Sequence, residues 1–364
     1  MPPSIEARND QLDGLRGYAA IAVVLFHSIL GPDPAMVSRV FYQNYSKIGS
    51  WYDAWAKLAL KVTNGETAVV IFFILSGAVL FDSLQKDRDG GLVPLAVKFF
   101  VRRFLRIYPA MLVCLFVCWA TFNLVGLPRT VDQLSQNLTL YDFQINGATW
   151  SLNVEAFGAV FLFLAYAAYR RFREFGIVVV GCIFASVYLH AFDGYLIQFR
   201  MFIYSFALGA LITTPLGRWV FERVPTRSWP LLLIAMIVAR HTIQETIAAF
   251  LIGLIYYRKA GAFGEFLAKP VSVFFGRISY SLYLFNVLFL EIFNVQLQSS
   301  PIARSYPVEF GLLSGSVIII LTIPIAYLSM RYIEKPFIGL GRRLTRTSSM
   351  PRPASGTLVN IPLR

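Results

Sequence analysis

The feature of this sequence that most limits its possible folds is a series of long apolar blocks. Blocks of about 15 to 25 residues, nearly free of charge, recur along the chain and are separated by short charged stretches. A helix of that length spans the hydrocarbon core of a bilayer and satisfies its own backbone polar groups there. The composition agrees, since 57% of the 364 residues are hydrophobic and only 15% are charged. The sequence therefore predicts an all-α fold, a polytopic helical bundle integral to the membrane.

Hydropathy predicts about ten membrane-spanning helices. Their expected ranges are 15–31, 65–82, 99–125, 148–169, 175–192, 198–214, 229–242, 243–257, 272–296 and 309–333. The seventh and eighth are short and separated only by a polar patch, so nine or eleven crossings stay open. We expect a membrane domain over residues 1–337, followed over residues 338–364 by a basic cytoplasmic tail whose Ser- and Pro-rich composition predicts disorder.

The net charge of +13 is explained by membrane topology rather than by nucleic-acid binding. Lys and Arg collect in cytoplasmic loops of membrane proteins. With the N-terminus inside, the even-numbered loops and the tail carry three or more basic residues each, and the third, fifth, seventh and ninth loops about one. This alternation predicts that both termini are cytoplasmic. The first loop breaks it with Arg39, Lys47, Lys57 and Lys61.

That first loop contains WYDAWAKLALKV, residues 51–62, in which Trp51 and Trp55 lie at helical spacing. The pattern predicts a short helix on the outer surface anchored by tryptophan, or alternatively a lid over an outer cavity. The following Thr63-Asn64-Gly65-Glu66 fits a capping box, which makes Glu66 a helix cap rather than a catalytic residue. The three cysteines lie inside apolar blocks and indicate packing, not a metal site.

Ionisable residues inside a membrane are candidates for function, because each costs about 2.5–3.5 kcal/mol to insert. In LDGLRGYAAIAVVLFHS, residues 12–28, Arg16 and His27 share a helix face, with Asp13 a further turn back. Arg16 is expected at the cytoplasmic border and His27 roughly 16 Å further out. The alternatives are a snorkelling anchor for Arg16 and a satisfied interface residue for His27.

Further polar residues are expected at the two ends of the bundle. In KFFVRRFLRIYP, Arg103 and Arg106 lie one turn apart, and with Arg16 they either set topology or bind a diphosphate at the cytoplasmic mouth. Trp150 of ATWSLNVEAFGAVF suits the outer aromatic belt. Glu155, a turn and a half deeper, needs a partner, for which His27 is the candidate and another polar helix residue the alternative.

In GRISYSLYLFNVLF, residues 276–289, three polar residues form a stripe at helical spacing, namely Ser279, Tyr283 and Asn286. Such a stripe either holds helices together or lines a site. It rises towards the outer half of the membrane, where His27 and Glu155 are also expected.

These segments, in this order, resemble a known family. LDGLRGYAAIAVVLFH, FFILSGAVLF, RRFLRIYPA, WSLNVE, RISYSLYLFN and YIEKPF are similar to motifs of the acyltransferase family 3 membrane proteins, from residue 12 to about 337. The resemblance implies transfer of an acyl group, most often acetyl from acetyl-CoA, to sugar hydroxyls of surface polysaccharides and lipopolysaccharides or to other small acceptors.

The resemblance also implies roles for individual residues. His27 matches the family's essential histidine, Arg103 and Arg106 its arginine pair, and Glu155 its acidic residue. The SYSLYL motif commonly ends in histidine but here ends in Asn286, which argues against a two-histidine relay and leaves Asn286 as a candidate oxyanion donor. The expected catalytic residues are His27, Glu155 and Asn286, and the expected substrate-binding residues are Arg16, Arg103, Arg106, Asp13, Trp150, Ser279 and Tyr283.

The expected function is that of an O-acetyltransferase in a bacterial inner membrane, with acetyl-CoA as co-substrate and no metal. The expected acceptor is an exopolysaccharide or other surface glycan, or its lipid-linked precursor, and polysaccharide-assembly enzymes are possible partners. His27 would act as general base or be acylated first, and the sequence leaves both routes open. A secondary transporter or lipid-linked oligosaccharide flippase is the alternative class.

Overall fold

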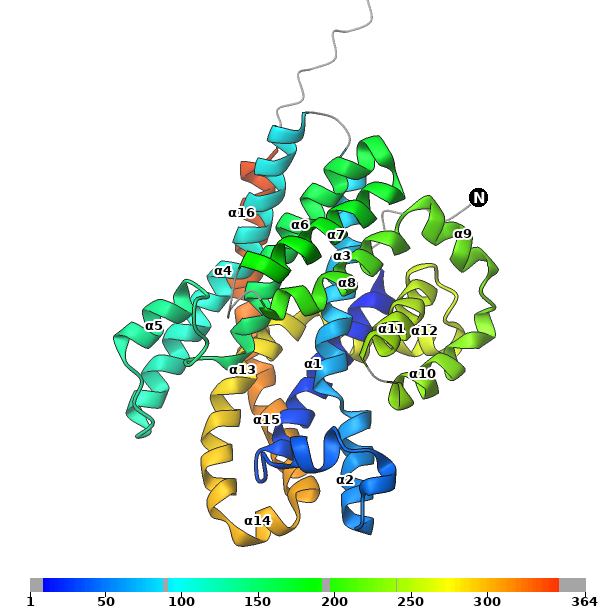
Figure 1. Cartoon of the computed structure of the whole chain (residues 1–364). Coiled ribbons are helices and arrows are strands. Elements are labelled where there is room, and N and C mark those ends of the chain that lie inside the picture. The colour runs from blue at the N-terminus through cyan, green and yellow to red at the C-terminus, as the bar shows by residue number, and fades with distance from the viewer. Residues whose placement is uncertain (1–8, 88–90, 192–196, 240, 347–364) are drawn as a thin grey trace, which may run out of the picture.

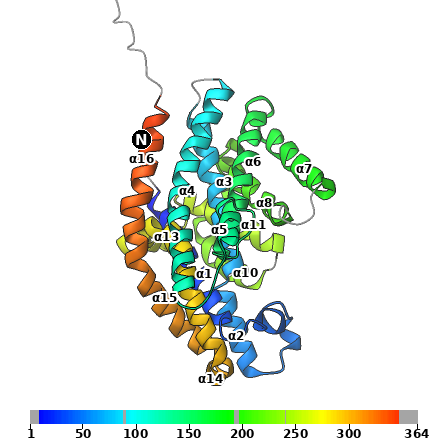
Figure 2. The same ribbon diagram turned by 90° about the vertical axis from the view of Figure 1, so that its left-hand side faces the viewer.

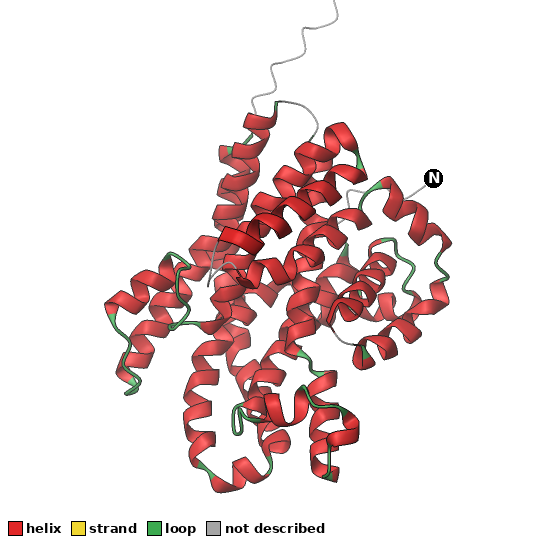
Figure 3. Cartoon of the chain, in the orientation of Figure 1, coloured by secondary structure: helices red, strands yellow, loops and turns green. Residues whose placement is uncertain are grey.

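The computed structural model describes residues 9–87, 91–191, 197–239 and 241–346. These residues are almost entirely helical, and no strand occurs among them (Figure 3). The predicted all-α fold is therefore confirmed for this part of the chain.

Three helices form the centre of the bundle, α1 (Asp10–Leu30), α3 (Gly65–Lys86) and α13 (Pro270–Ser299). In the spans that contain these three helices, 67–72% of the most apolar stretch is buried. The corresponding share is 39% in α4 (Leu92–Leu124) and 33% in the span that begins with α15 (Pro307–Ser329). The central helices are therefore covered by protein on most sides, whereas α4 and α15 leave much of their apolar surface uncovered, as lipid-facing helices do.

The remaining helices surround this centre (Figures 1 and 2). Three helices pack on the α3 side: α6 (Trp150–Phe172), α7 (Glu174–Ala191) and α8 (Ile197–Ile212). The next elements along the chain are α9 (Pro215–Arg223), η4 (Thr226–Ser228), α10 (Trp229–Val238), α11 (His241–Tyr256) and α12 (Gly261–Leu267). At the end opposite α16 (Lys335–Leu344) lie α2 (Trp51–Val62) and α14 (Pro301–Ser305). The short connecting elements are η1 (Val37–Phe41), η2 (Tyr45–Lys47), α5 (Val131–Leu138), η3 (Gly147–Thr149) and η5 (Met330–Glu334).

Each of the ten predicted spans coincides with a helix, but fewer qualify as membrane spans. Among the described residues, six helical runs are long and apolar enough to cross a bilayer, or seven if the pair 242–256 and 261–267, bent by 77°, counts as one. The apolar helices over 174–186, 202–212 and 226–238 are shorter. At 1.5 Å per residue they rise roughly 15–20 Å, less than the ~30 Å hydrocarbon core. The count of ten and the cytoplasmic position of both termini stay predictions.

The helix predicted over residues 51–62 is present as α2, which has one exposed apolar face and one buried face. Trp51 is 88% exposed and Val62 is 62% exposed, whereas Lys57 is fully buried on the opposite face. Lys57 Nζ donates hydrogen bonds to the carbonyl oxygens of Val40 and Phe41, which end the π-helical turn η1. The exposed apolar stripe suits contact with lipid head groups. The buried lysine holds η1 against α2.

The predicted capping box before α3 is wrong in detail. Asn64, not Thr63, is the N-cap, and its side chain accepts a hydrogen bond from the Thr67 backbone N–H. Thr63 Oγ1 instead donates to the Ala59 carbonyl of the preceding helix. Glu66 accepts a hydrogen bond from the Tyr42 hydroxyl. Glu66 therefore does not cap this helix, contrary to the prediction.

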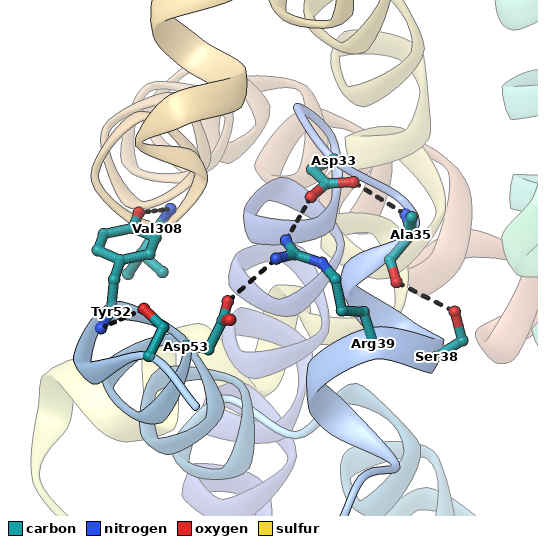
Figure 4. A network of polar contacts seen from close by, with 8 residues as sticks. Asp33, Ala35, Ser38, Arg39, Tyr52, Asp53 and Val308 are labelled. Atoms are coloured by element: carbon teal, nitrogen blue, oxygen red, sulfur yellow. Dashed lines mark hydrogen bonds and ion pairs between the residues drawn. The ribbon is translucent and has the colours of Figure 1, made fainter. Parts of the chain in front are cut away.

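Ion pairs and a tyrosine tie the loop around η1 to its neighbours (Figure 4). Arg39 of η1 pairs with Asp33 at 2.8 Å and with Asp53 of α2 at 3.2 Å. Tyr52 accepts a hydrogen bond from the Val308 backbone N–H and donates one to Glu309, which connects α2 to the start of α15. Part of the unusual positive charge of the first loop is thus used to fix its fold.

The predicted disordered tail begins later than the sequence indicated. Helix α16 runs from Lys335 to Leu344, and Arg102 of α4 donates a hydrogen bond to Thr345 at 2.7 Å. Residues 338–344 are therefore part of the packed structure, because the amphipathic α16 lies against α4. Residues 347–364 of the predicted tail lie outside the described residues.

Helices α1 and α13 cross closely because glycines meet at their contact. A Cβ atom at Gly17 would lie 2.6 Å from the Gly276 backbone nitrogen, and one at Gly276 would lie 2.0 Å from the Asp13 carbonyl oxygen. Any side chain larger than hydrogen must push the two backbones apart. The crossing brings Arg16 of α1 near the polar stripe of α13, and it therefore positions the site described below.

Substituting Gly276→Leu should lower the stability of the protein by about 1–3 kcal/mol, the usual effect of overpacking. Thermal unfolding in detergent, followed by size-exclusion chromatography, measures the change. Gly181→Leu is the matched control, because a Cβ atom at Gly181 has no atom within 4 Å. Equal unfolding temperatures for the two variants would contradict the close crossing.

Candidate active site

A polar cavity lies inside the apolar bundle, at the junction of five helices. It encloses about 780 Å³, including its open mouth. Its polar lining comes from α1, α3, α4, α6 and α13 and consists of Arg16, Ser76, Arg103, Arg106, Ser151, Glu155, Ser279, Tyr280 and Tyr283. Its apolar lining consists of Val69, Phe72, Phe73, Leu75, Val79, Leu80, Ile107 and Leu152. A cavity that combines apolar walls with convergent polar groups is typical of a ligand site.

An ion pair spans the cavity wall between α4 and α6. Arg103 Nη2 lies 3.2 Å from Glu155 Oε2, and both side chains are largely buried. Ser76 Oγ of α3 donates to Glu155 Oε1 at 2.6 Å. The carboxylate thus has a charge partner and a hydrogen-bond donor, as a buried charge requires. Arg103 Nε donates to no atom of the described residues.

These contacts correct the partner that the sequence suggested for Glu155. His27 does not line the cavity, and the carboxylate is bound by Arg103 and Ser76 instead. The reason is the length of α4, which begins at Leu92 and runs for 33 residues. Arg103 therefore lies roughly 16 Å into the helix, at the depth of Glu155 rather than at the end of the bundle. Arg106, one turn on, is exposed and remains accessible in the cavity.

The polar stripe of α13 contributes two of its three predicted residues. Tyr283 donates from its hydroxyl to the Ala148 carbonyl at 3.1 Å, and Ser279 Oγ donates to the Gly276 carbonyl at 2.9 Å. Both line the cavity. Asn286 does not line it, and its Nδ2 donates to the carbonyls of Leu282 and Tyr283 in its own helix. An oxyanion contact by Asn286 stays a prediction and requires exchange of one of these bonds.

The other predicted residues lie outside the cavity lining. Asp13 is buried at the crossing of α1 and α13. The Trp150 ring packs against Phe73 at 6.2 Å and Phe202 at 5.6 Å between ring centroids. His27 lies in the last turn of α1, and its Nδ1 is 2.8 Å from the Val23 carbonyl oxygen. The structure thus places six of the ten predicted site residues in one cavity: Arg16, Arg103, Arg106, Glu155, Ser279 and Tyr283.

Sequence reasoning missed three polar residues that line the cavity, Ser76, Ser151 and Tyr280, and also Glu334, which does not line it. Tyr280 donates to the Ile107 carbonyl at 2.7 Å and joins α13 to α4. Buried Glu334, at the end of the π-helical turn η5, accepts a hydrogen bond from Ser281 and interacts electrostatically with Arg106 and Arg16. All four occur in motifs already noted, FFILSGAVLF, WSLNVE, RISYSLYLFN and YIEKPF. A polar residue inside each apolar motif was the signal that could have found them.

Among the described residues, no group of three His, Cys, Asp or Glu side chains could hold a metal ion. The chemistry that the site's own side chains offer is anion binding, by three arginines, and hydrogen bonding, by serine and tyrosine hydroxyls.

The fold and this cavity define a helical membrane protein with an arginine-rich ligand site inside the bundle. The acyltransferase domain that characterises acyltransferase family 3 matches residues 9–331, nearly the whole chain, and the chain belongs to that family. Comparison with curated proteins and with solved structures gave no match. The family resemblance of the sequence motifs is therefore confirmed, and the protein is a membrane acyltransferase by family.

Replacing Glu155 by Met should destabilise the protein by about 3 kcal/mol or more, because Arg103 is left buried without a counter-ion. The double substitution Arg103→Met with Glu155→Met should recover most of that loss, since both charges are then gone. Denaturant titration in detergent micelles measures both. A double variant less stable than the single one would show that the ion pair is not the main contact of these two side chains.

Proposed function

We propose that the protein is an O-acetyltransferase that moves an acetyl group from cytoplasmic acetyl-CoA to a sugar hydroxyl of an exopolysaccharide or other surface glycan, or of its lipid-linked precursor. The observation that carries the proposal is the convergence of Arg16, Arg103 and Arg106 on one cavity in an apolar bundle. Three guanidinium groups inside a membrane protein call for anionic ligands. Membership of an acyltransferase family makes the acyl donor the ligand of choice.

The charges of the cavity suit a phosphorylated donor. Among the residues that line the cavity, Arg16, Arg103 and Arg106 are basic and Glu155 is acidic, which leaves an excess of positive charge. Arg103 is committed to Glu155 by the 3.2 Å ion pair. Arg106, which is exposed in the cavity, is therefore the best-placed group to bind the diphosphate of CoA, and guanidinium suits phosphate oxygens geometrically.

In our proposal the long donor spans the distance between Arg16 and His27. Arg16 and His27 lie on one helix, eleven residues and roughly 16 Å apart. In our proposal the pantetheine arm runs past the apolar residues of α3 that line the cavity, Val69, Phe72 and Leu80, and carries the thioester towards His27. The first helix then sets the distance between the two ends of the donor. The phosphate end binds at Arg16 and the acetyl end lies at His27.

At the acceptor end, His27 acts on the sugar hydroxyl. Its Nδ1 is bonded to the Val23 carbonyl, which can only accept, so Nδ1 carries the proton and Nε2 is left as the basic nitrogen. Nε2 either removes the proton from the acceptor hydroxyl or is acylated first and then discharged to the sugar. Trapping an acetyl group on His27 in the absence of acceptor would select the second route. The proposed setting is a bacterial inner membrane, with polysaccharide-assembly enzymes as partners.

Arg106→Ala should weaken acetyl-CoA binding about tenfold or more, because a charge-assisted hydrogen bond to phosphate is lost. Equilibrium binding of acetyl-CoA to purified protein in detergent measures the effect. Arg277→Ala is the control, since Arg277 is an exposed arginine of α13 that does not line the cavity. An Arg106→Ala variant that binds acetyl-CoA as tightly as the control would refute the assigned donor site.

Loss of His27 should abolish acetylation of the acceptor. We would compare the O-acetyl content of surface and secreted polysaccharide by proton NMR in three strains: one with the native protein, one without it, and one with His27→Ala at equal membrane level. Acetyl signals should disappear in both altered strains. Unchanged acetylation would reject a surface-glycan acceptor or acetyl as the group transferred. Loss of the polymer itself would favour a flippase.

A further inference from the structure

A second polar group lies at the end of α1 that carries His27, outside the cavity lining, and joins that histidine to two residues not used above. It consists of His27 in the last turn of α1, Tyr42 just after η1, and Glu66 in the first turn of α3. The Tyr42 hydroxyl donates a hydrogen bond to the Glu66 carboxylate. All three residues keep exposed surface, so a molecule from outside the bundle can reach them.

Aromatic packing fixes these three residues relative to one another. The Phe26 ring meets the His27 ring edge-on at 5.5 Å and the Phe41 ring at 5.2 Å, and Phe41 in turn contacts Tyr42 at 5.1 Å. A Cβ atom at Gly65 would lie 2.8 Å from Phe26, so α3 approaches α1 directly beside Glu66. The histidine, the tyrosine and the first turn of α3, which carries the carboxylate, thus all pack around the same pair of phenylalanine rings.

Glu66 is the carboxylate whose charge acts on His27. Other charged groups on the surrounding elements are engaged elsewhere: Arg39 with Asp33 and Asp53 (Figure 4), Lys57 with carbonyls of η1, Lys61 over the Phe41 ring, and Glu309 with Tyr52. Glu291 of α13 lies near the same level, since its neighbour Leu290 shares an apolar cluster with Val24, but it is not among the charges that act on His27. His27 also lies at the C-terminal end of α1, whose dipole favours a positive charge. The Glu66 charge and the helix dipole thus both act in favour of a positive charge on the ring.

Tyr42 keeps the carboxylate in place. Burial, followed by the hydrogen bond to Glu66, raises the pKa of Tyr42 to about 12, so its hydroxyl stays protonated and remains a donor throughout the neutral range. Glu66 also lies one helical turn beyond Val69, which lines the cavity at its α3 wall. The cavity thus extends along α3 towards this group.

We propose that Tyr42, Glu66 and His27 form the acceptor side of the active site, in which Glu66 is the positioning residue for His27 and a hydroxyl of the sugar binds at His27 Nε2. The inference rests on the proposed acetyltransferase function and extends it. Nε2 takes the hydroxyl proton as the acceptor oxygen bonds to the acetyl carbon. The C–S bond of the thioester breaks, and the proton passes from His27 to the CoA sulfur, which restores the neutral ring.

The test follows the reactivity of His27 and needs neither acceptor nor turnover. Diethyl pyrocarbonate modifies unprotonated imidazole, and the modified His27 peptide is separable by mass spectrometry in a chain with three histidines. We would measure its modification rate against pH in the full-length protein in detergent, for the native form, Glu66→Gln, Glu66→Asp and Glu309→Gln. Glu309 is the matched control, because it accepts a tyrosine hydrogen bond at the same end of the molecule but does not act on His27.

Removing the Glu66 charge should make the imidazolium less favourable, so the pH of half-maximal modification moves down and the rate at pH 6 rises about threefold or more. Glu66→Asp, which keeps the charge, should stay close to the native protein, as should Glu309→Gln. If Glu66→Gln reacts like Glu309→Gln at every pH, the assignment of Glu66 is overturned, even where acetyl transfer is observed. A shift without any acetyl transfer would retain the Glu66–His27 pair and remove the proposed function.

Discussion

The structure depends on one constraint: a charge placed inside an apolar helical bundle must find a partner there. Arg103 and Glu155 satisfy it together, across 3.2 Å between α4 and α6, with Ser76 of α3 as a third contact. This pair sets the relative depth of the two helices, because neither residue could move along its helix axis without losing its counter-charge. The cavity is the space that remains beside the pair once these helices and the α1–α13 crossing are in place.

In our proposal, binding and chemistry are separated along one helix. Arg16 lines the cavity near the start of α1, and His27 lies in its last turn. A donor with a phosphate head and a long arm suits such a layout, since affinity and reactivity are then needed at different points. In our interpretation the two carboxylates also have different roles. Glu155 neutralises an arginine in the wall of the cavity, and Glu66 acts on the histidine.

The basic residues of the first loop, which depart from the loop-charge pattern, stabilise the conformation of the loop that carries Tyr42. Lys57 is buried against carbonyl oxygens of η1, and Arg39 joins Asp33 to Asp53. These residues are basic for local structural reasons rather than as a signal of topology. The positive-inside rule counts charge without knowing where each side chain ends, so it could not distinguish the two uses.

The sequence by itself determined the class of fold, the helix at each apolar block and most of the polar residues that line the cavity. Apolar length and helical spacing are local properties, so Arg16, Arg103, Arg106, Glu155, Ser279 and Tyr283 could be singled out without coordinates. Only the tertiary structure decided how deep α4 places its arginines, which partner Glu155 takes, and that Asn64 rather than a Thr–Glu box begins α3. Those outcomes depend on where separate helices cross and how long each runs, and a backbone crossing such as Gly17 on Gly276 leaves no trace in the periodicity of either helix.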